Sequence, residues 1–145
     1  MQNASGAVVN ISSIAGICGR SGPAACFLND GYSAANRAVQ GLTENWAREA
    51  APNIRVNELM LGLINRRHGE NTRGWAALSD RQRQDLLEHT LLDRLGNPQE
   101  VAEAVYFLSV EATFMTGSTI RMDGGYILGG DTVPPLPPGI LQTSS

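Results

Sequence analysis

The sequence has little of what secreted, metal-binding or nucleic-acid-binding proteins rely on. It holds only two cysteines, Cys18 and Cys26, and they lack the spacing of a metal site. Without a secretory signal at the N-terminus, we expect reduced thiols and a cytoplasmic location. Acidic residues outnumber basic ones, 14 to 11, so we expect no nucleic-acid partner. No stretch approaches the roughly 18 consecutive apolar residues of a membrane span, so we expect no membrane insertion.

The residues that are present suffice for one folded domain. The chain has 145 residues, of which 42% are hydrophobic, which is enough for a buried core. Ala7–Ser12 and Ile54–Met60 are short apolar runs typical of buried strands. Between them, Tyr32–Ala51 shows helical spacing, with an apolar stripe of Ala35, Ala38, Val39, Leu42, Trp46 and Ala50. A strand, a long helix and a further strand predict a parallel sheet.

The remaining segments show weaker patterns. Residues 13–31 are rich in glycine and predict a loop. In the polar stretch 62–97, Ser79 and Gln82 have the spacing of a capping box and predict a helix. Pro98–Val110 predicts another helix, capped by Asn97, with Glu100 at its third position and a stripe of Val101, Ala104, Val105 and Leu108. Ser118–Met122 predicts a last strand.

Two hydroxyl groups fall where ligands of open α/β folds bind. Ser12 and Ser13 lie at the end of the first predicted strand, and Tyr32 begins the long predicted helix. Ligands of open α/β folds bind at the carboxyl ends of parallel strands. A tyrosine hydroxyl can give a proton to a developing alkoxide, and a serine hydroxyl can hold a carbonyl oxygen. The pair alone favours ordinary surface and capping residues over a catalytic site.

Several short motifs occur in one order along the chain, and together they favour a catalytic site over ordinary surface residues. They are NISSIAG at 10–16, YSAA at 32–35, IRVN at 54–57, GNPQEVA at 96–102, TGS at 116–118 and DGG at 123–125. In this order they resemble the C-terminal half of a short-chain dehydrogenase/reductase, over about residues 6–130.

The resemblance implies an α/β fold with a Rossmann-like, doubly wound parallel sheet, of which this chain holds only the C-terminal half. Residues 1–130 would form the catalytic and substrate part, and residues 131–145 a proline-rich arm. The implied chemistry is NAD- or NADP-dependent reduction of a carbonyl or oxidation of an alcohol. By motif position, Ser13 would orient the carbonyl and Tyr32 would donate or accept the proton. Gly62 and Ile64 would line the nicotinamide, with the Ile64 backbone at its carboxamide.

One departure from the family concerns its Tyr-x-x-x-Lys motif, in which Asn36 stands at the lysine position. In the family, that lysine holds the nicotinamide ribose and favours ionisation of the tyrosine. Asn36 lies on the same helix face as Tyr32, so both residues are expected to bind the cofactor, but an amide brings no charge.

Further departures lie around the second strand and the first loop. Leu61 replaces the family's proline before Gly62, and Arg66 replaces its usual threonine near the pyrophosphate. The gap of 19 positions between Ser13 and Tyr32 is several residues longer than usual.

The glycine-rich turn that holds the dinucleotide in the family has no counterpart here. Gly16-x-x-Gly19-x-x-Gly22 follows a strand but leads into a proline-containing loop. Two hypotheses therefore stay open: the catalytic half of an oxidoreductase, or a non-catalytic remnant that serves as an association module. A serine hydrolase is a weaker third, because no Gly-x-Ser-x-Gly elbow is present. In either main case we expect little turnover from this chain alone.

The resemblance also implies partners. The substrate would be a small-molecule carbonyl or alcohol, contacted by a variable lid over Asn65–Thr90. Within that lid, Arg66–His68 favours a solvated turn, and neither it nor Trp75 identifies a substrate. The chain is expected to form a homo-oligomer, a dimer or tetramer, because in the family the catalytic-tyrosine helix and the last strand join subunits. An unpaired edge on the first strand would also attract other chains.

Overall fold

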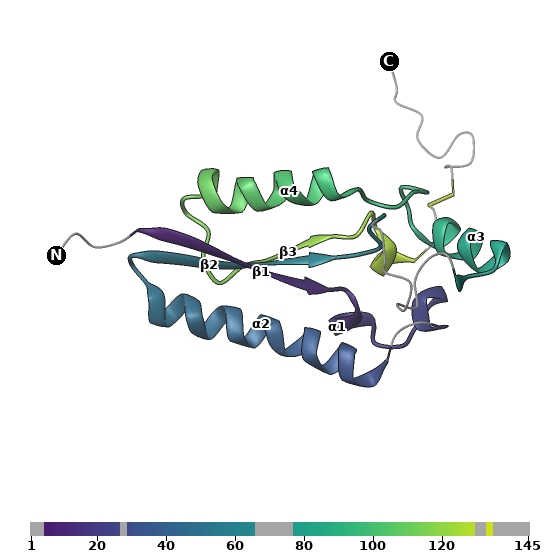
Figure 1. Cartoon of the computed structure of the whole chain (residues 1–145), viewed down its shortest axis with the longest axis horizontal. Coiled ribbons are helices and arrows are strands. Elements are labelled where there is room, and N and C mark those ends of the chain that lie inside the picture. The colour runs from purple at the N-terminus through teal and green to yellow at the C-terminus, as the bar shows by residue number, and fades with distance from the viewer. Residues whose placement is uncertain (1–4, 27–28, 66–76, 130–132, 135–145) are drawn as a thin grey trace, which may run out of the picture.

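A parallel sheet lies between two helices in the computed structural model, which describes residues 5–26, 29–65, 77–129 and 133–134 (Figure 1). The strands are β1 (Gly6–Ser13), β2 (Ile54–Leu61) and β3 (Thr119–Met122), and the sheet order is β1-β2-β3. Helix α2 (Asp30–Ala50) covers one face and helix α4 (Pro98–Tyr106) the other. The predicted α/β fold with parallel strands is confirmed.

Strand β2 is the middle of the sheet and the most buried element. It pairs with β1 over its whole length, from Gly6 opposite Ile54 to Ser13 opposite Leu61. It pairs with β3 over its second half, where Glu58 lies opposite Thr119. The five central residues of β2 are all buried, because a helix covers each face of the sheet.

Helix α2 begins two residues before the predicted start and turns a different side toward the sheet. Its N-cap is Asn29, whose side chain accepts a hydrogen bond from the backbone N–H of Tyr32 at 2.8 Å. Of the predicted apolar stripe, Val39 and Ala50 are half-buried, whereas Leu42 and Trp46 are 44% and 43% exposed. Thr43 and Ala47 are the buried residues of the helix.

A polar group on the sheet lies against the buried side of α2. Asn10 of β1 donates a hydrogen bond from its side-chain amide to the hydroxyl of Thr43 at 2.9 Å. The Thr43 hydroxyl in turn donates to the carbonyl of Val39 at 2.8 Å. Buried polar groups require partners, so the helix presents a hydroxyl to the sheet in place of its larger apolar side chains.

The segment predicted as a loop contains two short helices, so that expectation was wrong in part. Helix α1 (Ala15–Cys18) follows β1 directly, and a 3-10 helix, η1 (Pro23–Cys26), precedes α2. A side chain at Gly16 would lie 2.8 Å from the backbone nitrogen of Arg37, so only glycine lets α1 pack this closely on α2.

The predicted capping signals are confirmed. Ser79 and Asn97 each form a complete capping box, at the starts of α3 (Asp80–His89) and α4. Arg94 hydrogen-bonds Glu100, the third residue of α4, and this contact lowers the pKa of Glu100 to about 2.

Helix α4 is shorter than predicted, because the chain continues from Tyr106 as a π-helix, η3 (Phe107–Glu111). The guanidinium of Arg55 on β2 donates to the carbonyls of Leu108, Ser109 and Ala112, each at 2.8 Å. These bonds satisfy carbonyls at the end of the helix that have no partner within it.

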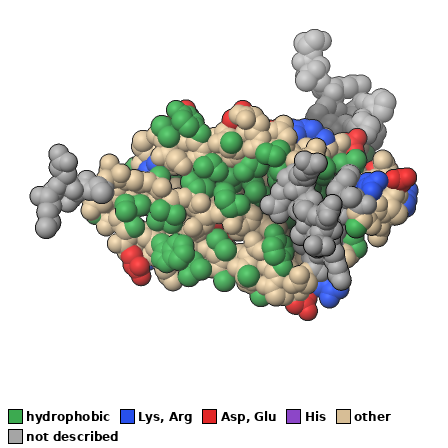
Figure 2. Space-filling view, viewed as in Figure 1, with side chains coloured by type: hydrophobic (Ala, Val, Ile, Leu, Met, Phe, Trp, Pro, Cys, Tyr) green, Lys and Arg blue, Asp and Glu red, His purple; other side chains and the backbone are tan. Residues whose placement is uncertain are grey.

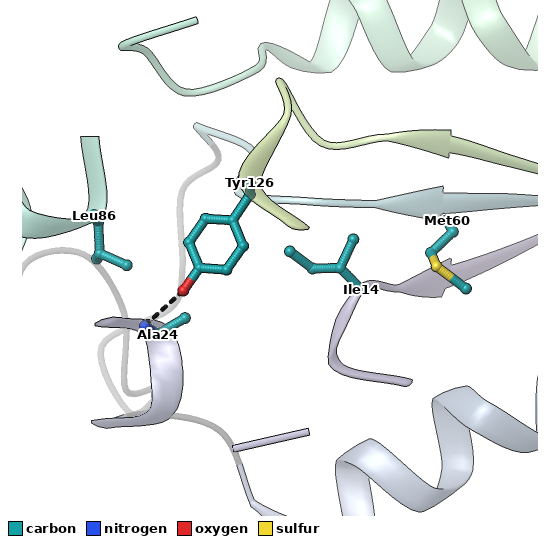
Figure 3. Close-up of a cluster of buried hydrophobic side chains, with 5 residues drawn as sticks. All are labelled: Ile14, Ala24, Met60, Leu86 and Tyr126. Atoms are coloured by element: carbon teal, nitrogen blue, oxygen red, sulfur yellow. Dashed lines mark hydrogen bonds between the residues drawn. The ribbon is translucent and has the colours of Figure 1, made fainter. Parts of the chain in front are cut away.

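Two buried clusters hold the layers together. One lies at the carboxyl end of the sheet and contains Ile14, Ala24, Met60, Leu86 and Tyr126 (Figure 3). There Tyr126, in the 3-10 helix η4 (Tyr126–Leu128), accepts a hydrogen bond from the backbone N–H of Ala24 at 2.9 Å. The other cluster lies below α4 and contains Leu59, Leu108 and Ala112, with Val101, Ala104 and Val105 packed against it.

Some predicted features lie outside the described residues. These are Arg66–His68 and Trp75 of the expected lid, and all of the proline-rich arm except residues 133–134. Among the helices of the described residues, none is both long enough and apolar enough to cross a membrane.

Candidate active site

The residues predicted to carry chemistry gather at the carboxyl end of the sheet. Ser13 is the last residue of β1, and Gly62 directly follows β2. Helix α2 runs back along the sheet, so that its first turn, with Tyr32, lies at this same end (Figure 1). Ligands of open α/β sheets bind at this edge.

Ser13 is held in the turn between β1 and α1. Its side-chain oxygen accepts a hydrogen bond from the backbone N–H of Ala15 at 3.2 Å, and the residue is half-buried. A hydroxyl that accepts one hydrogen bond still has its own proton to donate. The local structure therefore orients Ser13 and leaves its O–H available for a carbonyl oxygen.

Tyr32 is anchored through its backbone and leaves its ring accessible. Its N–H is bound by the Asn29 cap, and its carbonyl accepts from Asn36. The side chain is 45% exposed, and its hydroxyl has no hydrogen-bond partner among the described residues. A hydroxyl in this position can exchange a proton with a bound ligand.

Asn36 stands one turn further along α2, as the motif predicts. Its side-chain amide nitrogen donates to the Tyr32 carbonyl at 2.8 Å, which leaves its oxygen as a hydrogen-bond acceptor for a ligand hydroxyl. All 11 basic residues of the sequence are arginines, so no lysine of this chain can replace the missing ammonium group. Arg37 is exposed, about 100° further round the helix.

Gly62 and Ile64 lie in the short segment that directly follows β2. A side chain at Gly62 would lie 2.6 Å from the Cα atom of Asp123, so a glycine is required for this close approach. Ile64 forms an isolated parallel bridge with Gly96, made by the N–H of Asn65 and the carbonyl of Leu63. The N–H and carbonyl of Ile64 itself take no part in this bridge and face away from it.

Asp123 is a structural residue of the site to which the sequence analysis assigned no role. Its two carboxylate oxygens accept hydrogen bonds from the backbone N–H groups of Gly125 and Ile127, each at 3.0 Å, and Arg121 lies 3.3 Å away. The carboxylate thereby shapes the turn after β3 that packs against Gly62. Its place in the DGG motif was the available signal.

The sequence analysis also assigned no role to Glu58, which lies in the middle of β2. It is fully buried and accepts hydrogen bonds from the hydroxyls of Ser12 on β1 and Thr119 on β3, the latter at 2.6 Å. Its carboxylate links all three strands just below the site.

A small pocket of about 200 Å³ lies next to Tyr126, and none of the predicted site residues lines it. Its lining includes Cys18, Ser21, His89 and Tyr126. Burial raises the pKa values of the Cys18 thiol and the Tyr126 phenol, so both groups stay protonated near neutral pH. Cys18 and Cys26 are both free thiols. Among the described residues, no group of three or more His, Cys, Asp or Glu side chains could hold a metal ion.

Comparison with known proteins identifies the class to which this fold and site belong. A family model described as enoyl-(acyl carrier protein) reductase matches residues 1–127. A short-chain dehydrogenase/reductase of Burkholderia xenovorans superposes with a TM-score of 0.68 and 33% identity, over 89% of this chain and 44% of that one. The chain belongs to the short-chain dehydrogenase/reductase family, whose members use NAD or NADP.

The chain is also similar to individual proteins that are named as reductases. The chain is 37% identical to a 3-oxoacyl-[acyl-carrier-protein] reductase of Thermotoga maritima, over 85% of this chain and 46% of the relative. It is 38% identical to carbonyl reductase family member 4 of Danio rerio, over 83% of this chain and 44% of the relative. The chain thus spans about half the length of the relatives it matches.

A substitution at Gly62 tests how closely the segment after β2 packs against Asp123. We expect Gly62→Ala to lower the free energy of unfolding by about 1–3 kcal/mol, because the added carbon would overlap the backbone of Asp123. Gly41→Ala is the matched control, since nothing lies within 4 Å of that position in α2. It should raise stability by about 0.5–1 kcal/mol. Urea unfolding measures both, and equal stabilities for the two variants would contradict the close approach.

Proposed function

We propose that this chain provides the catalytic and substrate half of an NAD- or NADP-dependent carbonyl/alcohol oxidoreductase. The observation that carries the proposal is the pair of available hydroxyls, Ser13 and Tyr32, at one carboxyl edge of a parallel sheet. The relatives, named as 3-oxoacyl-[acyl-carrier-protein] and carbonyl reductases, support a small carbonyl or alcohol substrate.

The residues divide the chemistry between them. The Ser13 hydroxyl donates a hydrogen bond to the substrate's carbonyl oxygen, where negative charge develops during reduction. The Tyr32 hydroxyl then gives its proton to that oxygen, and in the oxidation direction it accepts the proton back. NAD or NADP, when bound, accepts or supplies the hydride.

The described residues fit the nicotinamide end of such a cofactor. The outward N–H and carbonyl of Ile64 match the donor and acceptor of a carboxamide, and the Asn36 side-chain oxygen can accept from a ribose hydroxyl. Because Gly62 has no side chain, the segment after β2 packs closely against Asp123.

Because Asn36 brings no positive charge, we expect the two directions of the reaction to be affected differently. Reduction needs a protonated tyrosine, whereas oxidation near neutral pH needs the ionised form, which the lysine of the family favours. With Asn36 in its place, oxidation should be the impaired direction. Without a glycine-rich turn in its sequence, the chain alone should also hold the dinucleotide poorly and show little turnover.

The experiment joins this chain to the cofactor-binding part of the Thermotoga maritima reductase and compares Asn36 with Asn36→Lys. A positive charge within a few ångströms favours the ionised form of an acid by about one to three orders of magnitude. We therefore expect Asn36→Lys to speed alcohol oxidation at pH 7 by about 10- to 1000-fold, with a smaller effect on ketone reduction.

Ala38→Lys supplies the control, because it adds the same charge at an exposed position on another side of α2. It should leave both rates unchanged. The proposal fails if the asparagine form already oxidises alcohols at pH 7 as fast as the lysine form, or if the joined protein has no reductase activity with either residue.

The second candidate function, an association module, is favoured by exposed apolar side chains on the helices. Leu42 and Trp46 of α2 are 44% and 43% exposed, and Tyr106, Phe107 and Val110 of α4 and η3 are 57%, 45% and 54% exposed. We infer that the chain forms a homo-oligomer, a dimer or tetramer, whether or not it retains catalysis. Exposed groups of apolar side chains such as these are typical of interaction sites.

Light scattering at tens of micromolar tests the association. We expect the unaltered chain to be larger than a monomer, and the double variant Leu42→Glu with Trp46→Glu to shift toward the monomer, because charged groups are costly to bury in an interface. Leu92→Glu, at a separate exposed position, should not change the mass. A monodisperse monomer of the unaltered chain would refute the inference.

A further inference from the structure

The pocket beside Tyr126 lies where three segments far apart in the sequence meet, and the proposed reaction makes no use of it. Its lining comes from the end of α1 and the turn after it, from the last residue of α3, and from η4 with the residue after it. Its volume is about 200 Å³, below the roughly 300–1,000 Å³ of sites for drug-sized ligands. A ligand that fits is therefore small.

The most buried residue of the lining carries a hydroxyl with a proton to donate. Tyr126 is 2% exposed, and its side-chain oxygen accepts a hydrogen bond from the backbone N–H of Ala24 at 2.9 Å (Figure 3). The hydroxyl proton itself has no acceptor among the described residues. Burial raises the pKa of this phenol, so it stays a neutral donor near neutral pH. Such a group favours a ligand that supplies an acceptor.

His89 borders the same space, and its ring nitrogens are also available. The ring packs edge-on against Tyr126, with 4.7 Å between the centroids, and has no hydrogen-bond partner among the described residues. A side chain at Gly22 would lie 3.0 Å from the Tyr126 hydroxyl and 3.6 Å from Nε2 of His89. A side chain at Gly129 would lie 3.6 Å from Cε1 of His89. The two glycines therefore leave the imidazole and the hydroxyl open to a ligand.

The pocket presents no negative charge, since no acidic residue lines it among the described residues. The acids closest in sequence to the lining residues have partners of their own. Asp85 of α3 lies 2.8 Å from Arg81, and Glu88 accepts a hydrogen bond from Gln84 at 3.0 Å. Both carboxylate oxygens of Asp123, ahead of η4, accept from backbone N–H groups. An anion in the pocket thus meets two donors and no like charge.

The rest of the lining is neutral or apolar. Ile127 and Leu128 contribute apolar side chains, and the Cys18 thiol stays protonated because burial raises its pKa. We propose that this pocket binds a short aliphatic carboxylate, whose oxygens accept hydrogen bonds from the Tyr126 hydroxyl and the His89 imidazolium and whose chain lies against the apolar wall. The site goes beyond the proposed function, because binding there requires neither a dinucleotide nor turnover.

The charge of the imidazole sets how binding depends on pH. A histidine gains its positive charge between about pH 8 and pH 5, whereas a carboxylate stays ionised over this whole range. As the pH falls, His89 becomes an oppositely charged partner for the ligand. Hydrogen bonds between charged groups are roughly twice as strong as those between neutral ones, so affinity should rise from pH 8 to pH 6.

The experiment titrates the unaltered chain with sodium butyrate at constant ionic strength and follows binding by saturation-transfer NMR on the butyrate methyl signal. For a ligand of this size we expect a dissociation constant on the order of 1 mM at pH 6. Binding should be about fivefold weaker at pH 8. Butyramide, which has the same shape and no charge, is the matched control ligand and should bind more weakly at pH 6.

Two variants test the donors. Tyr126→Phe should weaken butyrate binding by at least about tenfold, because it removes a hydrogen bond to a charged group. Tyr106→Phe removes a hydroxyl from an exposed tyrosine of α4 and should bind as the unaltered chain does. His89→Gln keeps a neutral donor, so binding should lose its dependence on pH. Circular dichroism checks the fold of each variant, and His89→Gln leaves the bond between Tyr126 and Ala24 in place.

The proposal is overturned if butyrate at 50 mM gives no saturation transfer, or if butyramide binds as tightly as butyrate at pH 6. It is also overturned if His89→Gln keeps the full pH dependence, or if a folded Tyr126→Phe binds as well as Tyr106→Phe.

Discussion

The fold depends most on the contact between Arg55 of β2 and the carbonyl groups at the end of the α4–η3 helix. One guanidinium satisfies the carbonyls of Leu108, Ser109 and Ala112, and so ties the helical layer to the middle strand. Charge-assisted hydrogen bonds of this kind are stronger than those between neutral groups. Without them, the carbonyls of Leu108 and Ser109 would lose this donor, whereas the carbonyl of Ala112 would keep the N–H of Met115.

The next polar residues of β2 extend this link to both neighbouring strands. Asn57 donates to the Met115 carbonyl at 2.8 Å and accepts from the Ser118 N–H, which sets the entry into β3. Glu58 binds the hydroxyls of Ser12 and Thr119. Because β1, β2 and β3 are held in register this way, their carboxyl ends align, and the site residues that follow them meet at one edge.

Much of the fold could be predicted from the sequence, because it is encoded locally. The two capping boxes and the apolar runs of β1 and β2 depend on neighbouring residues alone. The side of α2 that packs could not be predicted in the same way, because Thr43 faces inward and bonds to Asn10, 33 residues away in the sequence. The contact of Arg55 with η3 likewise joins residues more than 50 positions apart, so no local pattern predicts it.

The site residues also differ in how far local sequence predicts them. Ser13, Tyr32 and Asn36 lie in short motifs that fix their own backbone, so their positions at the carboxyl edge followed from sequence. The need for glycine at position 62 comes from its contact with Asp123, which only the folded chain reveals. The buried carboxylate of Glu58 could not be predicted, because its partners Ser12 and Thr119 are far from it in the sequence.

The most direct test of the central claim, that polar side chains of β2 hold the layers in place, is the unfolding free energy of Arg55→Met in urea. The account predicts that the free energy of unfolding falls by about 1.5–3 kcal/mol or more, because several carbonyls lose the same donor. This is the range for one hydrogen bond to a charged group. Arg48→Met removes an exposed arginine of α2 and should change stability by no more than about 0.5 kcal/mol. If Arg55→Met unfolds at the same urea concentration as Arg48→Met, the claim is contradicted.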